Sequence, residues 1–547
     1  MEARKAANHA VPLGSLVLAL LLAIVVLPTA LRPPPDEANA SAELSPDAPP
    51  EDDPDAIIET LQQAGSRTAG ATGQDQVVQE DAVTTSTAPP TTVEQAPARG
   101  QCYGDPPRQT ESFYSPPCTA AFVGDNGGAT WTNVTADQIN IGYWHVFGMP
   151  VNRGPIPEVP PAGEDAAGRT ARVIQAYFNQ RYETYGRRIQ LVAIRDDPLD
   201  EPGSRASAVE EVETDHLFAA VHLNDPFCDE ITRRQLVCFS GNGTRDEVYA
   251  SHDPFWWSYQ MQIDKVDAMN AEYICKRLIG GNADFAAGAI QGTPRKIAIF
   301  VESTSGNSFR SADAIKQRVE AMCGYSDLLT VEVADAQSAP AAMARIRAAG
   351  TTTIVTEAGA TIMAVAMRVA DASGYQPEWV MLNSYGLDLN DGARLFLPAG
   401  QLSQLFGMSG WELPRRFEDT DCYRAYKSID PAGVPDANFC SLLFISLEQI
   451  VNGIQQAGPT LTPSTFAQGE YSMPLGQSRA GWMITGNFGP NDHAFVDSLL
   501  DMYWDPNAID PQGGETGAFR FNYGGERFRP GELPTEIVRD GITGYQG

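Results

Sequence analysis

Residues 139–147 read INIGYWHVF, and after a turn rich in proline and glycine, residues 164–194 read EDAAGRTARVIQAYFNQRYETYGRRIQLVAI. The first run is largely apolar and has the length of a strand that is covered on both faces. In the second run apolar side chains recur at spacings of three and four residues, which predicts an amphipathic helix. We expect Gly186 to end this helix and residues 189–194 to form a second strand. Strand, helix and strand in about fifty residues make a right-handed βαβ unit with parallel strands.

The same alternation continues along the chain. Further strands are predicted at residues 216–223, 235–239, 296–301, 328–333, 352–356 and 379–382. Further helices are predicted at residues 206–214, 263–280, 311–323, 340–349 and 361–372. Such alternation gives mostly parallel sheets that are flanked by helices. We expect the helix at 263–280 to cross from one sheet to the other, so that the chain holds two α/β lobes of ordinary domain size.

The C-terminal part begins with a strong helix signal. Residues 441–456 read SLLFISLEQIVNGIQQ, an amphipathic pattern that Gly458 and Pro459 bring to an end. Residues 517–534 read GAFRFNYGGERFRPGELP. Aromatic residues on both sides of a glycine pair predict a hairpin that turns at Gly524 and Gly525.

The order of these signals resembles a known family. A strand, a glycine- and proline-rich turn and a helix followed by FNQRYETYGRRIQLV (residues 178–192) are similar to the opening of type I periplasmic binding proteins. That family includes the leucine/isoleucine/valine-binding proteins of ABC importers. The similarity runs from Gln101 to the end, and SPPC followed by GDNGGAT (residues 115–118 and 124–130) resembles the lead-in of actinobacterial members.

The resemblance implies a two-lobed fold in which the chain crosses between the lobes three times. We place the later crossings near Gln401 and Asn491. Lobe 1 would then hold about 101–270 plus 401–490, and lobe 2 about 271–400 plus 491–547. Each lobe would be a mostly parallel sheet flanked by helices.

The N-terminus carries a targeting or anchoring signal. Arg4 and Lys5 precede the uncharged, Leu/Val/Ala-rich run 11–31, which is about long enough to cross a bilayer. We expect residues 1–31 to be a cytoplasmic stub and an uncleaved transmembrane helix, which gives a single-pass protein at the cell membrane with an extracellular binding domain. Cleavage near residues 38–40, giving a secreted protein, is the alternative. Residues 32–100, rich in Pro, Thr and acidic side chains, are expected to be a disordered tether.

Composition limits the classes of function. The net charge of −31 excludes a nucleic-acid-tracking surface, which must be basic. We find no G-x-S-x-G, H-E-x-x-H, Walker or G-x-G-x-x-G motif, so the chain is not expected to be an enzyme or to hold a cofactor. No C-x-x-C is present, which argues against a metal site.

Eight cysteines all lie beyond the apolar run, and an even number in an exported chain predicts disulfides. Eight cysteines allow 105 pairings. Pairing of nearest neighbours gives Cys102–Cys118, Cys228–Cys238, Cys275–Cys323 and Cys422–Cys440.

Ligands bind open parallel sheets beyond the carboxyl ends of the strands. In the resembling family the ligand lies between the lobes, and its carboxylate is held by hydroxyl and backbone N–H groups of the first lobe. The positions that match here are Ser240, Gly241, Gly243 and Thr244 in the first lobe, and Phe309, Glu357 and Tyr385 in the second. Trp144, His145, Trp256 and Trp257 are candidate walls of the site, although a tryptophan is more often part of the core.

The sequence departs from the amino-acid binders at one position. Where they carry an acidic residue for the ligand's amine, this chain reads LNSYGLD, and the match falls at Asn383, Ser384 and Tyr385. A buried ammonium without a counter-charge is costly. Glu357 or Asp388 would have to replace that residue; otherwise the ligand is not an α-amino acid.

Together these patterns predict an extracytoplasmic solute-binding protein. Its two lobes would close around a small amino-acid-like or amide-like ligand for delivery to the permease of an ABC importer. A membrane-anchored sensor of the same fold, or an envelope protein that has lost its ligand, are the alternatives that the sequence leaves open.

Overall fold

The computed structural model describes residues 102–144, 154–194, 201–222, 225–241, 243–303, 306–382, 386–474 and 486–545. These residues all belong to one compact unit of the chain. The expected anchor and tether lie outside the described residues. Within the described ranges, no helix is both long and apolar enough to cross a lipid bilayer.

The first sheet has six strands in the order β2-β3-β1-β4-β5-β6. The strands are β1 (Gln138–Tyr143), β2 (Gly154–Pro155), β3 (Arg188–Ala193), β4 (Leu217–His222), β5 (Val237–Ser240) and β6 (Trp256–Ser258). All neighbouring pairs are parallel except β2 with β3. The predicted βαβ unit is therefore confirmed, with β1 and β3 paired side by side.

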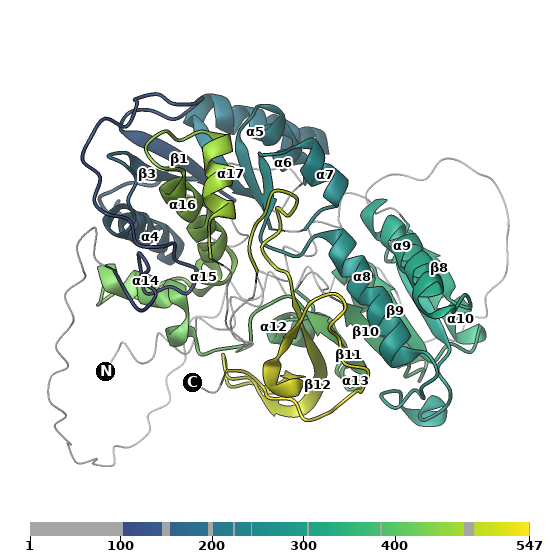
Figure 1. Ribbon diagram of the computed structural model, residues 1–547. Coiled ribbons are helices and arrows are strands. Elements are labelled where there is room, and N and C mark those ends of the chain that lie inside the picture. The colour runs from purple at the N-terminus through teal and green to yellow at the C-terminus, as the bar shows by residue number, and fades with distance from the viewer. Residues whose placement is uncertain are drawn as a thin grey trace, which may run out of the picture. The chain divides into compact units, whose positions relative to one another are not determined.

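Helices from two separate stretches of the chain surround this sheet (Figure 1). They are α4 (Ala166–Arg181), α5 (Glu201–Asp215), α6 (Asp225–Arg233) and α7 (Asp246–Ser251), followed much later by α14 (Asp421–Ile429), α15 (Ala437–Leu442), α16 (Phe444–Ala457) and α17 (Pro463–Tyr471). The ring of Phe178 on α4 stacks on Phe444 of α16 with centroids 6.1 Å apart. The late helices thus complete the first lobe.

Helix α4 forms as its pattern requires, but its end differs from the prediction. The carboxylate of Asp165 accepts the N–H of Gly168 at 2.7 Å and caps the first turn. The apolar face, which includes Tyr177 and Phe178, is buried. The helix ends at Arg181, and Gly186 lies in the following turn with a φ of +81°. The glycine is needed for that turn and does not itself end the helix.

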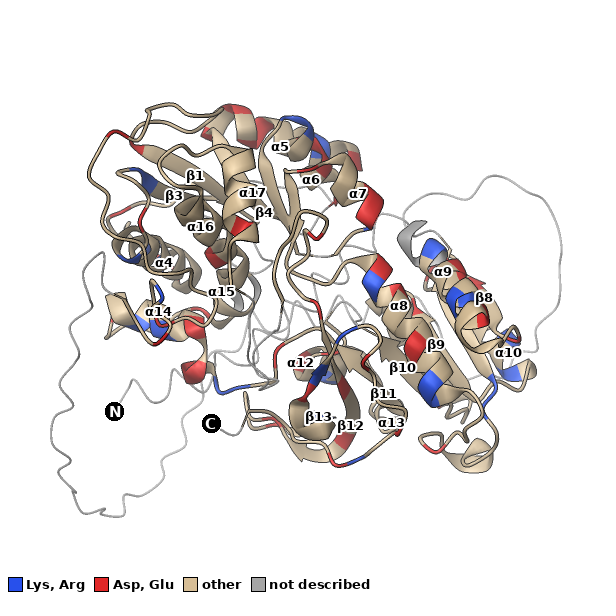
Figure 2. Ribbon diagram, in the orientation of Figure 1, with Lys and Arg blue, Asp and Glu red and all other residues tan. Residues whose placement is uncertain are grey.

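The second sheet has eight strands: β7 (Ile297–Glu302), β8 (Leu329–Val333), β9 (Thr353–Glu357), β10 (Glu378–Leu382), β11 (Leu405–Ser409), β12 (Leu499–Ile509), β13 (Thr516–Phe521) and β14 (Arg527–Phe528). Strands β7 to β11 pair in parallel, and β12 is antiparallel to β11, β13 and β14. The flanking helices include α9 (Gly306–Cys323), α10 (Ala339–Ala348), α11 (Ala360–Ala372), α12 (Asn390–Phe396) and α13 (Ala399–Leu402). Figure 2 shows acidic and basic residues interspersed along α8 (Ile263–Tyr273) and α9.

The hairpin predicted at Gly524 and Gly525 is not formed. Both β13 and β14 pair with β12 instead of with each other. Strand β12 is 11 residues long and β13 is 6 residues long, so β13 leaves part of the edge of β12 unpaired. The two glycines form a short 3-10 turn that brings Arg527 and Phe528 back to the unpaired beginning of the same edge.

Three segments join the two sheets. Helix α8, which continues as a π-helical turn through Leu278, leads from β6 to β7. Strand β11 belongs to the second sheet, so the second crossing starts after Ser409 and not near Gln401. The third crossing leads into β12, and its backbone lies beside that of the first crossing. Phe495 N–H donates to Ser258 O at 3.0 Å, and Val496 N–H donates to Tyr259 O at 3.1 Å.

All four predicted disulfides are present: Cys102–Cys118, Cys228–Cys238, Cys275–Cys323 and Cys422–Cys440. The first closes a loop at the start of the described chain. The third ties the π-helical turn after α8 to the end of α9.

Candidate functional site

The parallel strands of the first sheet end at Trp144, His222, Ser240 and Ser258. The Trp144 ring is partly exposed and lies edge-on to His222 with centroids 5.9 Å apart. His222 is buried and stacks on Phe227 at 4.0 Å. Trp144 is therefore placed at the strand ends where an aromatic wall of a ligand site was expected. Trp256 and Trp257 are buried in the core, and His145 lies outside the described residues.

The loop after β5 directs its donors inward. Gly241 N–H donates to His222 O at 2.9 Å, and Thr244 N–H donates to the Tyr249 hydroxyl at 3.0 Å. A Cβ on Gly243 would lie 1.9 Å from the carbonyl oxygen of Met261, so the glycine permits close packing against the chain itself. Ser240 and Thr244 are buried. These groups hold the loop together in this structure, and their role in binding a ligand stays a prediction.

The second sheet contributes Glu357 at the end of β9. Its Oε1 accepts a hydrogen bond from Asn270 Nδ2 on α8 at 2.8 Å. Burial, and next the negative charge of Asp267, raise the pKa of Glu357 to about 8. A carboxyl group that lacks a cationic partner among the described residues is protonated for much of the time near neutral pH. A carboxyl oxygen of Glu357 is thus able either to donate or to accept a hydrogen bond.

Next to Glu357 lies a cluster that joins the first lobe to the second. Arg245, just before α7, is 3.1 Å from Asp267 and 3.2 Å from Asp264, both on α8. Its guanidinium also donates to the Ser311 hydroxyl on α9 at 3.0 Å. Asp264, Asp267 and Asn270 follow one another at three-residue spacing, so they share one face of α8. Arg245, which contacts Asp264 and Asp267, and Glu357, which contacts Asn270, therefore lie on the same side of the crossing helix.

A second carboxyl group, that of Asp388, lies near the end of β11. It accepts the Trp411 indole N–H and the Gly386 backbone N–H, each at 3.2 Å. Burial raises its pKa to about 6, while a hydrogen bond from Ser409 acts against this shift. Within the described residues neither Asp388 nor Glu357 forms an ion pair. The second lobe therefore presents two carboxyl groups whose hydrogen-bond partners are neutral.

Four predicted residues of the second lobe cannot be placed in the site. Phe309 lies in the first turns of α9, but the placement of its side chain is not described. Asn383, Ser384 and Tyr385 lie outside the described residues.

One acidic group among the described residues has the spacing of a metal site. Ligand oxygens of Asp391, Asp510 and Glu515 come within 4.8 Å of one another. The Arg394 guanidinium lies among them, 2.7 Å from Asp510 and also bonded to Asp391. The guanidinium of Arg394 therefore already offsets part of the negative charge of these carboxylates.

Solved structures share this arrangement, although no family model and no curated relative matches the chain. An ABC-transporter substrate-binding protein of Aeropyrum pernix aligns with a TM-score of 0.50 and 14% identity over 73% of this chain and 98% of its own. A solute-binding protein of an ABC transporter from Rhodopseudomonas palustris HaA2, in complex with p-hydroxybenzoic acid, gives the same values. The chain has the fold of type I solute-binding proteins.

The predicted strands account for some of the residues that the structure brings to this region and not for others. Glu357 directly follows the predicted strand 352–356 and Trp144 lies late in the predicted run 139–147, and their role in binding a ligand stays a prediction. Arg245, Asp267 and Asn270 were not among the predicted positions, since each side chain contacts a neighbour from another element. The three-residue spacing of Asp267 and Asn270 on the predicted crossing helix was a usable signal for a polar face.

Proposed function

We propose that this protein is an extracytoplasmic solute-binding protein that closes two lobes around a small organic ligand and delivers it to an ABC importer. The observation that carries the proposal is the pair of parallel sheets joined by three crossing segments, with polar groups of both lobes gathered at Arg245 and Glu357. Ligands of such sheets bind beyond the carboxyl ends of the strands.

The chemistry of the second lobe favours a ligand that carries N–H groups. Glu357 and Asp388 bond only to neutral partners within the described residues, so each is able to accept a hydrogen bond from an amine or an amide. A cationic amine would lower the pKa of Glu357 from about 8 and fix its negative charge. This supports an amino-acid-like or amide-like ligand.

A thermal-shift screen of the full-length chain tests the proposal, with amino acids, short amides, urea-like compounds and aromatic acids as ligands. A ligand at a hundredfold excess over its Kd stabilises the folded protein by about 2.7 kcal/mol, which is a rise of a few degrees in Tm. For any compound that binds, calorimetry on Glu357→Gln should show at least tenfold weaker binding. Glu320→Gln, an exposed position on α9, is the matched control. A folded protein that none of these compounds stabilises contradicts the proposal.

The second candidate is a membrane-anchored sensor or a non-transporting envelope protein of the same fold. The apolar run at residues 11–31 and the tether after it favour this role, because they would keep the binding domain at one place on the membrane. The proposed location is therefore the cell membrane, with the binding domain outside. N-terminal sequencing of the mature protein distinguishes an anchored chain from one cleaved near residues 38–40. Loss of uptake of the identified ligand after gene deletion distinguishes an importer from a sensor.

A further inference from the structure

The disulfide loop at residues 102–118 is bound firmly to the first lobe. Gln109 Nε2 donates to the carbonyl oxygen of Arg181 at the end of α4 at 2.8 Å. Asn452 Nδ2, on α16, donates to the carbonyl oxygen of Tyr114 at 2.7 Å. Because both donors are buried, the backbone on each side of the Tyr114 side chain is held in place against the first lobe.

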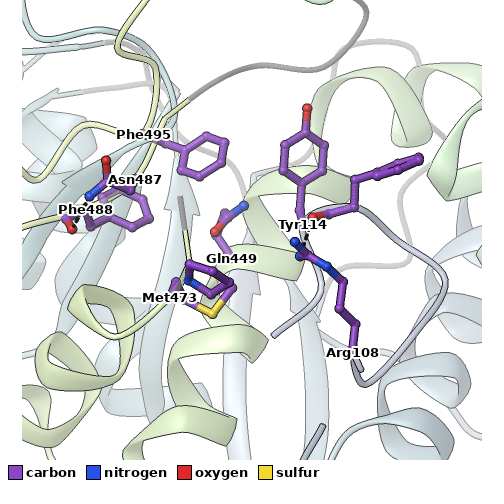
Figure 3. Close-up of a pocket in the computed structure, with 9 residues that line it drawn as sticks. Arg108, Tyr114, Gln449, Met473, Asn487, Phe488 and Phe495 are labelled. Atoms are coloured by element: carbon purple, nitrogen blue, oxygen red, sulfur yellow. Dashed lines mark hydrogen bonds between the residues drawn. The ribbon is translucent and has the colours of Figure 1, made fainter. Parts of the chain in front are cut away.

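The side chain of Tyr114 leaves this lobe and contacts two of the three crossing segments. Its hydroxyl donates to Glu412 Oε1 at 2.5 Å, just after the start of the second crossing. Its ring lies edge-on to Phe495 of the third crossing, with centroids 5.6 Å apart. Figure 3 shows Arg108 and Tyr114 on one side of a small pocket and Phe488 and Phe495 on the other.

The contact continues into the first crossing. Phe495 stacks on Tyr259 with centroids 6.1 Å apart and an interplanar angle of 18°. Tyr259 in turn lies 6.3 Å from the Trp411 ring of the second crossing. One side chain of the disulfide loop therefore touches an aromatic group to which all three crossings contribute. Any rotation of the lobes that shifts the crossings relative to the first lobe must move Glu412 or Phe495 against Tyr114.

We propose that Tyr114 is a positioning residue for lobe movement, and that the disulfide loop braces the hinge through it. The inference rests on the proposed function in that the brace matters only if the lobes move. It concerns the ligand-free protein, so its test does not require a ligand. The hydrogen bond has a carboxylate as acceptor, which makes it stronger than an ordinary neutral one. Its loss should release the crossings while leaving both lobes folded.

The experiment compares Tyr114→Phe with Tyr103→Phe in the full-length chain. Tyr103 lies in the same loop, and its hydroxyl accepts from Arg181 of the first lobe at 3.0 Å, so the control loses a hydroxyl that does not reach the hinge. Encoded azide-bearing residues at Val159 and Gln317, exposed positions in the first and second lobes, carry spin labels without disturbing the disulfides. Tyr114→Phe should widen the distribution of distances between the labels, and Tyr103→Phe should leave it as in the parent.

Hydrogen exchange gives a second readout. In Tyr114→Phe the amides of residues 410–416 and 493–498 should exchange about tenfold faster, which corresponds to the loss of one bond to a charged group. Glu412→Ala removes the acceptor from the other side and should widen the distance distribution in the same way. Unchanged distances in Tyr114→Phe and Glu412→Ala, with melting temperatures that show both to be folded, overturn the brace. That result leaves ligand binding untouched, so it does not bear on the proposed function.

Discussion

Glu448 allows a sharp prediction about stability and pH. It lies on α16, fully buried, and accepts hydrogen bonds from the Ser112 and Tyr182 hydroxyls, each at 3.0 Å. Within the described residues it forms no ion pair. Burial, and next the negative charge of Asp421, raise its pKa from the ordinary value of 4.5 to about 8, although the two hydroxyls act against the shift.

The direction of the effect follows from proton binding. Between pH 4.5 and 8 the folded protein keeps a proton on Glu448 that the unfolded chain releases, so the free energy of unfolding falls as the pH rises through this range. At about 1.4 kcal/mol per pKa unit, the full effect has an upper bound of about 5 kcal/mol. Glu448→Gln is neutral at every pH, and its amide oxygen can still accept from the same hydroxyls. The variant should therefore be several kcal/mol more stable than the parent at pH 8 and about equally stable near pH 4.5.

The assay is urea unfolding at pH 5, 6, 7 and 8, followed by tryptophan fluorescence with the disulfides kept oxidised. The matched control is Glu418→Gln, an exposed position where the same change should alter stability by less than about 0.5 kcal/mol at each pH. If the difference between Glu448→Gln and the parent is the same at pH 5 and pH 8, the reasoning from burial is wrong.

Three further changes test the packing of the lobes. Arg295 and Glu378 form a buried ion pair with two hydrogen bonds, of 2.7 and 2.9 Å. Arg295→Met should therefore lower the free energy of unfolding by about 3–5 kcal/mol. Adding Glu378→Gln should recover more than half of this loss in a double-mutant cycle. Gly407→Ala should prevent folding of the second sheet, seen as loss of soluble protein, because its Cβ would lie 1.7 Å from the carbonyl oxygen of Met381. Arg187 donates to four backbone carbonyl oxygens at 2.7–3.0 Å. Arg187→Lys should lower the free energy of unfolding by about 2–4 kcal/mol, measured by chemical denaturation. An unchanged denaturation midpoint would count against the role of the planar guanidinium.

The strands and helices were predictable because their signals are local. Residues 139–143 and 189–193 are mostly apolar, and both form parallel strands of the first sheet. The cysteine pairing was also predictable, since each cysteine pairs with its neighbour in the sequence, over 10 to 48 residues. Boundaries were less accurate: residues 263–280 form an α-helix only to Tyr273, followed by a π-helical turn.

What failed depended on contacts between distant segments. The glycine pair at 524 and 525 has the local pattern of a hairpin, yet β14 pairs with the free edge of β12 and not with β13. The donors after β5 are predicted to face a ligand, and in this structure Gly241 and Thr244 bond to His222 and Tyr249, so their role in binding stays a prediction. A pattern along the sequence shows that a hydrogen-bond donor is present, but it does not show with which acceptor the donor pairs in the fold.

The hinge has a construction that suits movement. The buried guanidinium of Arg527 donates to the carbonyl oxygens of Gly410 and Trp411 in the second crossing, at 2.9 and 2.8 Å, and of Ser498 in the third, at 2.7 Å. Burial lowers its pKa to about 10, so it stays charged near pH 7 and keeps all its donors.

All three of these acceptors are neutral. A bond from a charged guanidinium to a carbonyl contributes about 1.5–3 kcal/mol net, so the two crossings can shift by exchanging one bond at a time, whereas an ion pair would have to separate as a whole. Arg527 thus joins the second and third crossings at a common point without locking them. The bond from Tyr114 to Glu412, directly after Trp411, is charged and anchored to the first lobe, so it is the contact that limits how far they turn.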